Sequence, residues 1–394
     1  MNNTTDITPG LQDAVSMNNT TDMTPILQDA ISRHMGIGGF LEAFAPASIQ
    51  AERIVPPVWW VIGFLGNPVC AVIWYGRRMR RNNSSAVYLG SLAVSDFLFL
   101  ILHLMYNLHT VWGHDIYNAH GACEAFMFFF YLPQYMSVSL VAAFTVERYV
   151  AVCHPFLKEK WCTVRRAFIV VLILLIFCAA LSSGQIYLWS YHPGPDHCSY
   201  RLGTKEFVDV WNWTVDMIMF AAVPLLVLLF NVLVLREIIK LSSNGVITRQ
   251  QGRSSGNTAS TLTLLSVSFF LVVTQLAATV VLNIQVAIPV GDLMLSDDEI
   301  RADGVWSSFF TYMDVRKIVE VVCLSHFACY FFVYALTGKH FRREVLYLLT
   351  CHGKLHCLDF LFKKAHKGER YSMVSSNGHT LATDTCTTAY TTSM

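Results

Sequence analysis

Charged residues are scarce in this chain of 394 residues. Asp, Glu, Lys and Arg make up 14% of the sequence, and hydrophobic residues make up 54%, whereas a soluble domain carries about 25% charged residues. Long stretches hold almost no charge, so lipid is the expected solvent for much of the chain. The net charge is only +1, which gives no indication of nucleic-acid binding.

The sequence also lacks the arrangements that metal sites and enzymes need. Its eleven cysteines include no CxxC pair and no run with metal-ligand spacing. No nucleophile is accompanied by a recognisable base. We therefore predict neither a metal centre nor an enzyme.

Seven apolar stretches are long enough to cross a bilayer, which takes about 20 helical residues each. They cover residues 55–75, 86–106, 123–149, 167–189, 213–235, 260–289 and 315–337. We predict an all-α membrane protein, a seven-helix bundle over residues 55–338. Residues 1–54 form an outer tail, 339–350 a short amphipathic helix and 351–394 an inner tail.

The joints between the spans differ in charge. The joints after the first, third, fifth and seventh spans are basic, with Arg77, Arg78, Arg80, Arg81, Lys158, Lys160, Arg165, Arg166, Arg236, Lys240, Arg249, Arg253, Lys339, Arg342 and Arg343. The opposite joints are poor in Lys and Arg and include Asp297-Asp298-Glu299. Basic joints stay in the cytoplasm. We therefore expect a plasma-membrane protein with its N-terminus outside and its C-terminus inside.

The N-terminal tail contains a tandem repeat, with MNNTTDITPGLQDAVS at 1–16 and MNNTTDMTPILQDAIS at 17–32. Each copy carries N-x-[ST] sequons, which predict glycosylation at Asn2, Asn3, Asn18 and Asn19. A duplication without function also explains the repeat, and the two interpretations are compatible.

The positions of four cysteines suggest covalent modification. Cys123 opens the third span and Cys198 lies in the second outer joint, where an oxidising environment favours a disulfide between them. Cys351 and Cys357 follow the amphipathic stretch 339–350, a location that suits palmitoylation. Unmodified thiols remain the alternative at both of these last positions.

Several short motifs occur in the spans in a fixed order. They are Gly66-Asn67, Leu92-Ala93-Val94-Ser95-Asp96, Cys123 placed 25 residues before Arg148, Glu147-Arg148-Tyr149 with Pro155 behind it, Pro224, and Phe332-Val333-Tyr334. This ordered set, over about residues 55–350, resembles the rhodopsin-like (class A) G-protein-coupled receptors. The segments 161–167, 224–235 and 330–345 resemble invertebrate neuropeptide receptors, notably the FMRFamide-receptor-like group.

The sequence departs from this family where the helices are expected to hinge. Tyr330-Phe331 replaces the Asn-Pro pair of the seventh span, and the sixth span has neither proline nor tryptophan. The fourth span lacks the usual tryptophan. No acid lies near Asn257, where many relatives place a partner for the third-helix arginine. The family's usual switch chemistry therefore does not transfer directly to this chain.

The resemblance implies roles for residues inside the bundle. Glu147, Arg148, Tyr149 and Tyr334 would couple to a heterotrimeric G protein. Asp96, with Asn67 and Ser137 as partners, would form a polar core in mid-membrane, where the family holds a sodium ion. A protonated, hydrogen-bonded Asp96 is the alternative. The Ser/Thr-rich tail would recruit arrestin once phosphorylated.

The ligand is expected at the outer ends of the helices. Phe130 and Tyr131 occupy the region where amine receptors of this family carry an aspartate, which argues against a biogenic amine. Acids interleaved with aromatics suit a basic, amidated peptide. The predicted ligand contacts are Glu320, Asp216, Phe130, Tyr131 and Gln134, with Glu320 foremost at about three turns above Tyr330.

Two other functions remain open at this stage. A receptor of the same fold for a small non-peptide ligand, or a chemosensory receptor, would carry the same motifs. A transporter or channel would also cross the membrane, although inverted repeats and broken helices are not evident in the sequence.

Overall fold

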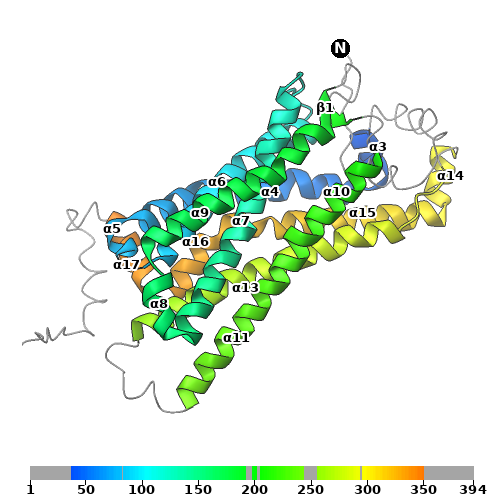
Figure 1. The fold of residues 1–394 in the computed structure, drawn as a ribbon. Helices are drawn as coiled ribbons and strands as arrows, with labels where there is room; N and C mark the ends of the chain where they lie inside the picture. The colour runs from blue at the N-terminus through cyan, green and yellow to red at the C-terminus, as the bar shows by residue number, and fades with distance from the viewer. Residues whose placement is uncertain are drawn as a thin grey trace, which may run out of the picture. The chain divides into compact units, whose positions relative to one another are not determined.

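The computed structural model describes residues 37–81, 83–191, 198–201, 205–243, 255–292 and 295–349. The chain divides into a unit of residues 1–345 and a unit of residues 346–394, and the helical spans belong to the first (Figure 1). Asn2, Asn3, Asn18, Asn19, Cys351 and Cys357 lie outside the described residues. Glycosylation and palmitoylation therefore stay predictions.

Among the described residues, seven helical spans are long and apolar enough to cross a membrane, which confirms the predicted fold class. In chain order they are α4 (Pro46–Tyr75), α6 (Ser85–Thr110), α7 (Ala122–Cys153), α9 (Val164–Leu188), the fifth span α10 (Lys205–Asp216), η1 (Met217–Ala222) and α11 (Val223–Ser243), α13 (Ser255–Ile284), and the seventh span α15 (Gly304–Cys323) with α16 (Ser325–Thr337).

Shorter elements connect the spans. They are α3 (Ile37–Phe44), α5 (Arg77–Arg80), α8 (Pro155–Trp161), the strands β1 (Trp189–Tyr191) and β2 (Cys198–Tyr200), η2 (Gln285–Ala287), α14 (Asp297–Ala302) and α17 (Lys339–Leu349). The helix α17 lies where the amphipathic helix was expected and ends one residue before the predicted boundary.

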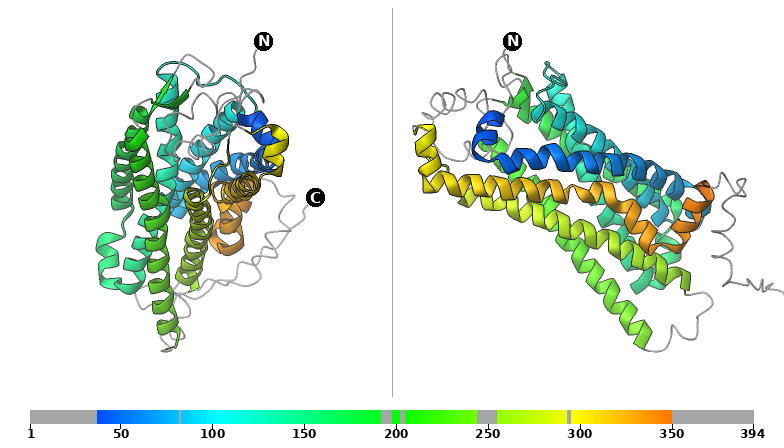
Figure 2. Two further views of the ribbon diagram at one scale, coloured as in Figure 1. Left: turned by 90° about the vertical axis from the view of Figure 1, so that its right-hand side faces the viewer. Right: turned by 180° about the vertical axis from the view of Figure 1, so that it is seen from behind.

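The third span, α7, packs against α6, α9 and α11, while α4 runs beside α6 and along α15 and α16 (Figure 2). The buried side chains of α6 and α7 fill the space between the helices. Leu172, Ile176 and Phe177 of α9 are exposed despite their apolar character. Such a surface is stable only in lipid, where the bilayer replaces the missing protein contacts.

The fifth span contains a π-helical segment, η1, immediately before Pro224. Proline has no N–H, so it cannot bond the carbonyl four residues earlier, that of Phe220. The Thr279 hydroxyl on α13 donates to this carbonyl at 2.8 Å. A neighbouring helix therefore satisfies the freed backbone group, as a lipid environment requires.

The seventh span begins at Gly304 rather than at the predicted residue 315, and it is interrupted at Leu324. The interruption needs no proline. Nδ1 of His326 lies 2.7 Å from the carbonyl oxygen of Cys323, so a side chain takes a backbone acceptor and disturbs the helical ladder. The long outer part of this helix is what positions the charged residues described below.

The first span also starts earlier than predicted, at Pro46 instead of residue 55. The preceding helix, α3, packs its aromatic face against α14 and α15. The cluster joins Phe40, Leu41, Ala45 and Ile49 to Ile300, Trp306, Phe309, Phe310, Tyr312 and Met313. This apolar core holds the N-terminal ends of α4 and α15 together.

Candidate functional site

Two ends of the bundle carry the predicted functional residues. The disulfide end is the end at Cys123 and Cys198, and the arginine end is the end at Arg148. At the disulfide end, Cys123 and Cys198 form the predicted disulfide, with 5.6 Å between their Cα atoms. The bond ties β2 to the start of α7, and β2 pairs antiparallel with β1.

Replacing Cys198 with serine should free this hairpin from α7. We expect the free energy of unfolding to fall by about 2–5 kcal/mol, as for other native disulfides. The measurement is the melting temperature of the purified protein together with its amount at the cell surface. Replacing the free thiol Cys329 with serine is the control, and equal losses in both variants would contradict a specific role for the bond.

Below the hairpin, α7 presents a chain of aromatic side chains toward α6. Phe130 stacks on Tyr106 at a centroid distance of 4.9 Å and contacts Phe99 at 5.7 Å. Tyr131 lies 5.9 Å from Tyr135. The predicted contacts Phe130 and Tyr131 thus belong to one aromatic surface inside the bundle.

The other two predicted contacts on α7 and the fifth span are less prominent. Gln134 donates to the backbone carbonyl of Phe130 at 3.1 Å, one turn earlier on its own helix. Asp216 is half-buried at the end of α10, directly before the π segment. Asp216 lies close enough to Tyr135 to interact with it electrostatically.

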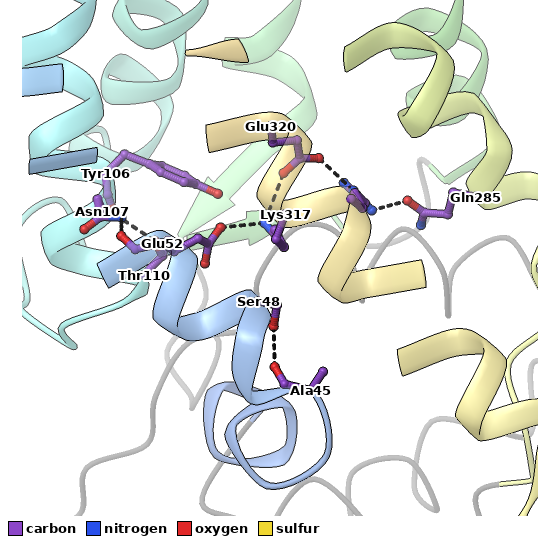
Figure 3. Close-up of polar contacts among 10 residues, drawn as sticks. Ala45, Ser48, Glu52, Tyr106, Asn107, Thr110, Gln285, Lys317 and Glu320 are labelled. Atoms are coloured by element: carbon purple, nitrogen blue, oxygen red, sulfur yellow. Dashed lines mark hydrogen bonds and ion pairs between the residues drawn. The ribbon is translucent and has the colours of Figure 1, made fainter. Parts of the chain in front are cut away.

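Glu320 lies in a network of four charged side chains, which are Glu52, Arg316, Lys317 and Glu320 (Figure 3). Its carboxylate accepts from Nε of Arg316 at 2.7 Å and lies 3.4 Å from Nζ of Lys317. Lys317 also reaches Glu52 of α4, with 2.7 Å between Nζ and Oε1. Arg316 further donates to the amide oxygen of Gln285. The network joins α4, α15 and η2, and its formal charges cancel.

The network reduces the net negative charge that a ligand would meet at Glu320. Its acid is compensated by Arg316 and Lys317, which the sequence analysis did not single out, although spacings of three and four residues on a helix indicate such pairs. The acid remains the accessible part, since Glu320 is 24% exposed against 6% and 10% for Arg316 and Lys317. Tyr106, which stacks on Phe130, lies close to Glu52 and Glu320.

The predicted polar core in mid-membrane is fully buried. Asp96, Asn67 and Ser137 are each at most 1% exposed. Asn67 donates to the carbonyl of Phe327 at 2.9 Å, while its Oδ1 has no hydrogen-bond partner among the described residues. Within the same part of the chain, both carboxylate oxygens of Asp96 and the hydroxyls of Ser137, Tyr330 and Tyr334 also lack one.

These unpartnered oxygens fit a small hard cation or ordered water. Ser137 and Tyr330 both lie near the Asp96 carboxylate, and a set of oxygens around one negative charge suits hard cations. Tyr330, which stands where the family has asparagine, thus adds a hydroxyl to the core. The structure is compatible with sodium here, and the ion stays a proposal.

At the arginine end, Arg148 and Glu147 meet through one serine of α6. Arg148 donates to the Ser85 hydroxyl and, at 3.5 Å, to Oδ1 of Asn83. Glu147 accepts from the hydroxyls of Ser84 at 2.7 Å and Ser85 at 3.0 Å. Among the described residues, the two neighbours do not form a direct ion pair, because adjacent side chains on a helix diverge.

The remaining predicted coupling residues lie on either side of this contact. Tyr149 packs its ring against Phe230 of α11, 5.1 Å away. Tyr334 is buried, with its ring 5.2 Å from Trp74 and 5.3 Å from Phe341 and 6.3 Å from Tyr330 of the polar core. Nearby, burial and then the Glu147 carboxylate raise the pKa of the Cys162 thiol, which keeps it protonated.

The short helix α8 adds a residue that the sequence analysis missed. Phe156 is 95% exposed and follows Pro155 at the arginine end. Aromatic residues, phenylalanine among them, are enriched at protein–protein interfaces. Its position behind Pro155 is visible in the sequence, but its exposure depends on the fold.

Comparison with known proteins identifies the family. Residues 67–313 match the family model described as 7 transmembrane receptor (rhodopsin family). This match covers more than half of the chain. The chain belongs to the rhodopsin family of seven-transmembrane receptors. It is therefore a class A G-protein-coupled receptor and not an enzyme, and the transporter or channel alternative is ruled out.

The receptor is also similar to individual peptide receptors. It is 28% identical to a neuromedin U receptor homologue of Caenorhabditis elegans over 151 residues, 37% of each chain. It is 26% identical to the pyrokinin-1 receptor of Drosophila melanogaster over 213 residues, 53% of this chain and 49% of the relative. The thyrotropin-releasing hormone receptor of Mus musculus is 31% identical over 131 residues, 33% and 32% of the two chains. The chain spans about a third to a half of these relatives' length.

Proposed function

We propose that this receptor transmits the binding of an extracellular neuropeptide, RFamide-like in chemistry, to a heterotrimeric G protein at the plasma membrane. In this proposal the disulfide end faces outward and the arginine end faces the cytoplasm. The basic joints support this orientation. The names of the similar receptors, several of which are peptide receptors, support the ligand class.

The observation that carries the proposal is the carboxylate network next to an aromatic surface. Glu320 is the accessible acid of the network, and Tyr106 connects the network to Phe130. A peptide with an aromatic and a guanidinium group would stack on the rings and pair with Glu320. To do so, its guanidinium has to replace Arg316 or Lys317 at that carboxylate.

This exchange supplies a mechanism for activation. Lys317 ties α15 to Glu52 of α4, and Arg316 ties it to Gln285 beside α13. A ligand that takes Glu320 alters both ties and favours the arrangement of helices in which it binds better. At the other end, release of Arg148 from Ser85 would expose it to the G protein, and arrestin would later bind the phosphorylated tail.

A peptide panel tests the proposal. Cells that express the receptor should give a calcium or cAMP response to amidated peptides ending in Arg-Phe, and a weaker one to the same peptides with arginine replaced by citrulline. Untransfected cells are the control. A response to small metabolites but to no peptide would favour the alternative, a class A receptor for a non-peptide ligand.

A further inference from the structure

A cavity of about 350 Å³ opens at the arginine end, between α4, α6, α7, α13 and the start of α17. Its wall includes Trp74, Ser85, Arg148, Leu264 and Phe341, so it reaches from the surface to the buried ends of the helices. This size is at the lower end of the range for small-molecule pockets. The proposed coupling residues form only one side of it.

The wall of the cavity is strongly positive. Five permanent cations line it, Arg78, Arg81, Arg148, Lys158 and Lys339, against the single carboxylate of Glu147, and one of the five, Arg78, also pairs with Glu344 at 3.9 Å. The carboxylate is already engaged by the hydroxyls of Ser84 and Ser85. Like charges gathered around one enclosed space repel each other, and a bound anion would relieve that repulsion.

The deeper wall offers hydrogen-bond donors without acceptors. Trp74 is 6% exposed, and its indole N–H has no hydrogen-bond partner among the described residues. Within the same described part of the chain, Nε of Arg148 is also buried without a partner. Buried donors are normally bonded, because leaving one unbonded costs free energy. Both donors belong to residues of the cavity wall, and an anion that enters deeply enough to reach them would supply the missing acceptor.

We propose that this cavity binds a polyphosphorylated anion, such as an inositol phosphate or the headgroup of a phosphoinositide. Several phosphates match the excess of positive charge better than a single carboxylate does, and guanidinium groups bind phosphate through paired hydrogen bonds. The proposal rests on the proposed orientation, which places the cavity at the inner leaflet. Because the anion would hold Arg148, its binding and that of the G protein are mutually exclusive.

The test uses the full-length receptor, purified and placed in phosphatidylcholine nanodiscs. In one arm inositol hexakisphosphate is added in solution, and in the other phosphatidylinositol bisphosphate is included in the disc. The readout is the melting temperature as a function of anion concentration. We expect a saturable rise in at least one arm, which also identifies whether the source is soluble or lipid, and a weaker effect at high salt.

Variants separate the cavity from the charged surface. Arg81→Gln with Lys158→Gln changes two exposed cavity cations and should weaken binding about tenfold or more. Trp74→Phe keeps a ring against Phe341 and Tyr334 but removes the N–H, and should weaken binding severalfold. Arg165→Gln removes an exposed charge outside the cavity and should have no effect.

Two results would overturn the proposal. One is the absence of a melting shift in both arms for a well-folded receptor, and the other is an equal loss of binding in the Arg165 variant, which would indicate a nonspecific surface effect. Neither measurement uses an agonist or a G protein. If the peptide panel gave no response, the anion-binding result would still stand. If no anion bound, the proposed coupling to a G protein would still stand.

Discussion

Charge reversal at Arg148 is expected to abolish G-protein activation while the receptor still reaches the cell surface. In the structure Arg148 is held by the Ser85 hydroxyl and by Asn83, so it is available for exchange without breaking a direct ion pair. Losing a charged, hydrogen-bonded contact in a complex costs roughly 2–5 kcal/mol. We therefore expect Arg148→Glu to reduce nucleotide exchange on the G protein about 100-fold or more.

Two controls make this result interpretable. Arg165→Glu reverses one exposed charge at the same end of the bundle and should leave coupling unchanged. Arg148→Gln retains a donor for Ser85 and should fold as the unaltered protein does, yet should couple as poorly as Arg148→Glu. Surface amounts are measured with an N-terminal epitope tag. Signalling that persists in Arg148→Glu at normal surface levels would refute the assigned role.

The arrangement around Arg148 illustrates which contacts the sequence reveals. The motif Glu147-Arg148-Tyr149 is continuous in the chain, so its place at the end of the third span could be predicted. Its partners could not, because Ser84 and Ser85 belong to α6 and meet α7 only through helix packing. Hydropathy places a helix in the membrane but does not specify how it is rotated against its neighbour.

The starts of the first and seventh spans were predicted too late for a related reason. Glu52 and Arg53 lie just before the predicted start of the first span, and Asp314 lies just before that of the seventh. A hydropathy average gives each charged residue the same value whether or not the residue is paired. In the structure Glu52 pairs with Lys317, Arg53 pairs with Glu42, and Asp314 accepts from the backbone N–H of Ser48 at 2.7 Å, so both helices continue outward past these residues. A contact across 265 positions depends on tertiary structure.

Proline accounts for only some of the irregularities in the helices. Pro224 in the fifth span, which lacks an N–H, follows a π segment, whereas Pro68 and Pro133 lie inside α-helices. The seventh span has no proline and is nevertheless interrupted at Leu324, where His326 contacts the Cys323 carbonyl. The absence of Asn-Pro therefore does not make this helix continuous. The seventh span is interrupted where the His326 side chain, and no proline, contacts the backbone.

Neutralising Glu320 is expected to lower both the stability of the receptor and its affinity for the ligand, and the two effects can be measured separately. In Glu320→Gln, Arg316 and Lys317 remain buried with only one acid, Glu52, in the network. Removing one partner from a buried ion pair costs roughly 3–5 kcal/mol. We expect a loss of this size in the free energy of unfolding, seen as a lower melting temperature. Glu42→Gln, in an exposed pair with Arg53, should cost less than about 1 kcal/mol.

A second substitution separates structure from recognition. Arg316→Met combined with Glu320→Gln restores the charge balance of the network and leaves Lys317 paired with Glu52, so much of the lost stability should return as a coupling energy in a double-mutant cycle. Affinity for a basic peptide should not return, because the acid that receives its guanidinium is still absent. The peptide concentration that gives a half-maximal response should stay about ten- to a hundredfold higher than for the unaltered receptor. If stability and affinity recover together, Glu320 only holds α15 in place. If affinity stays low in a stable double variant, Glu320 is the ligand's own partner.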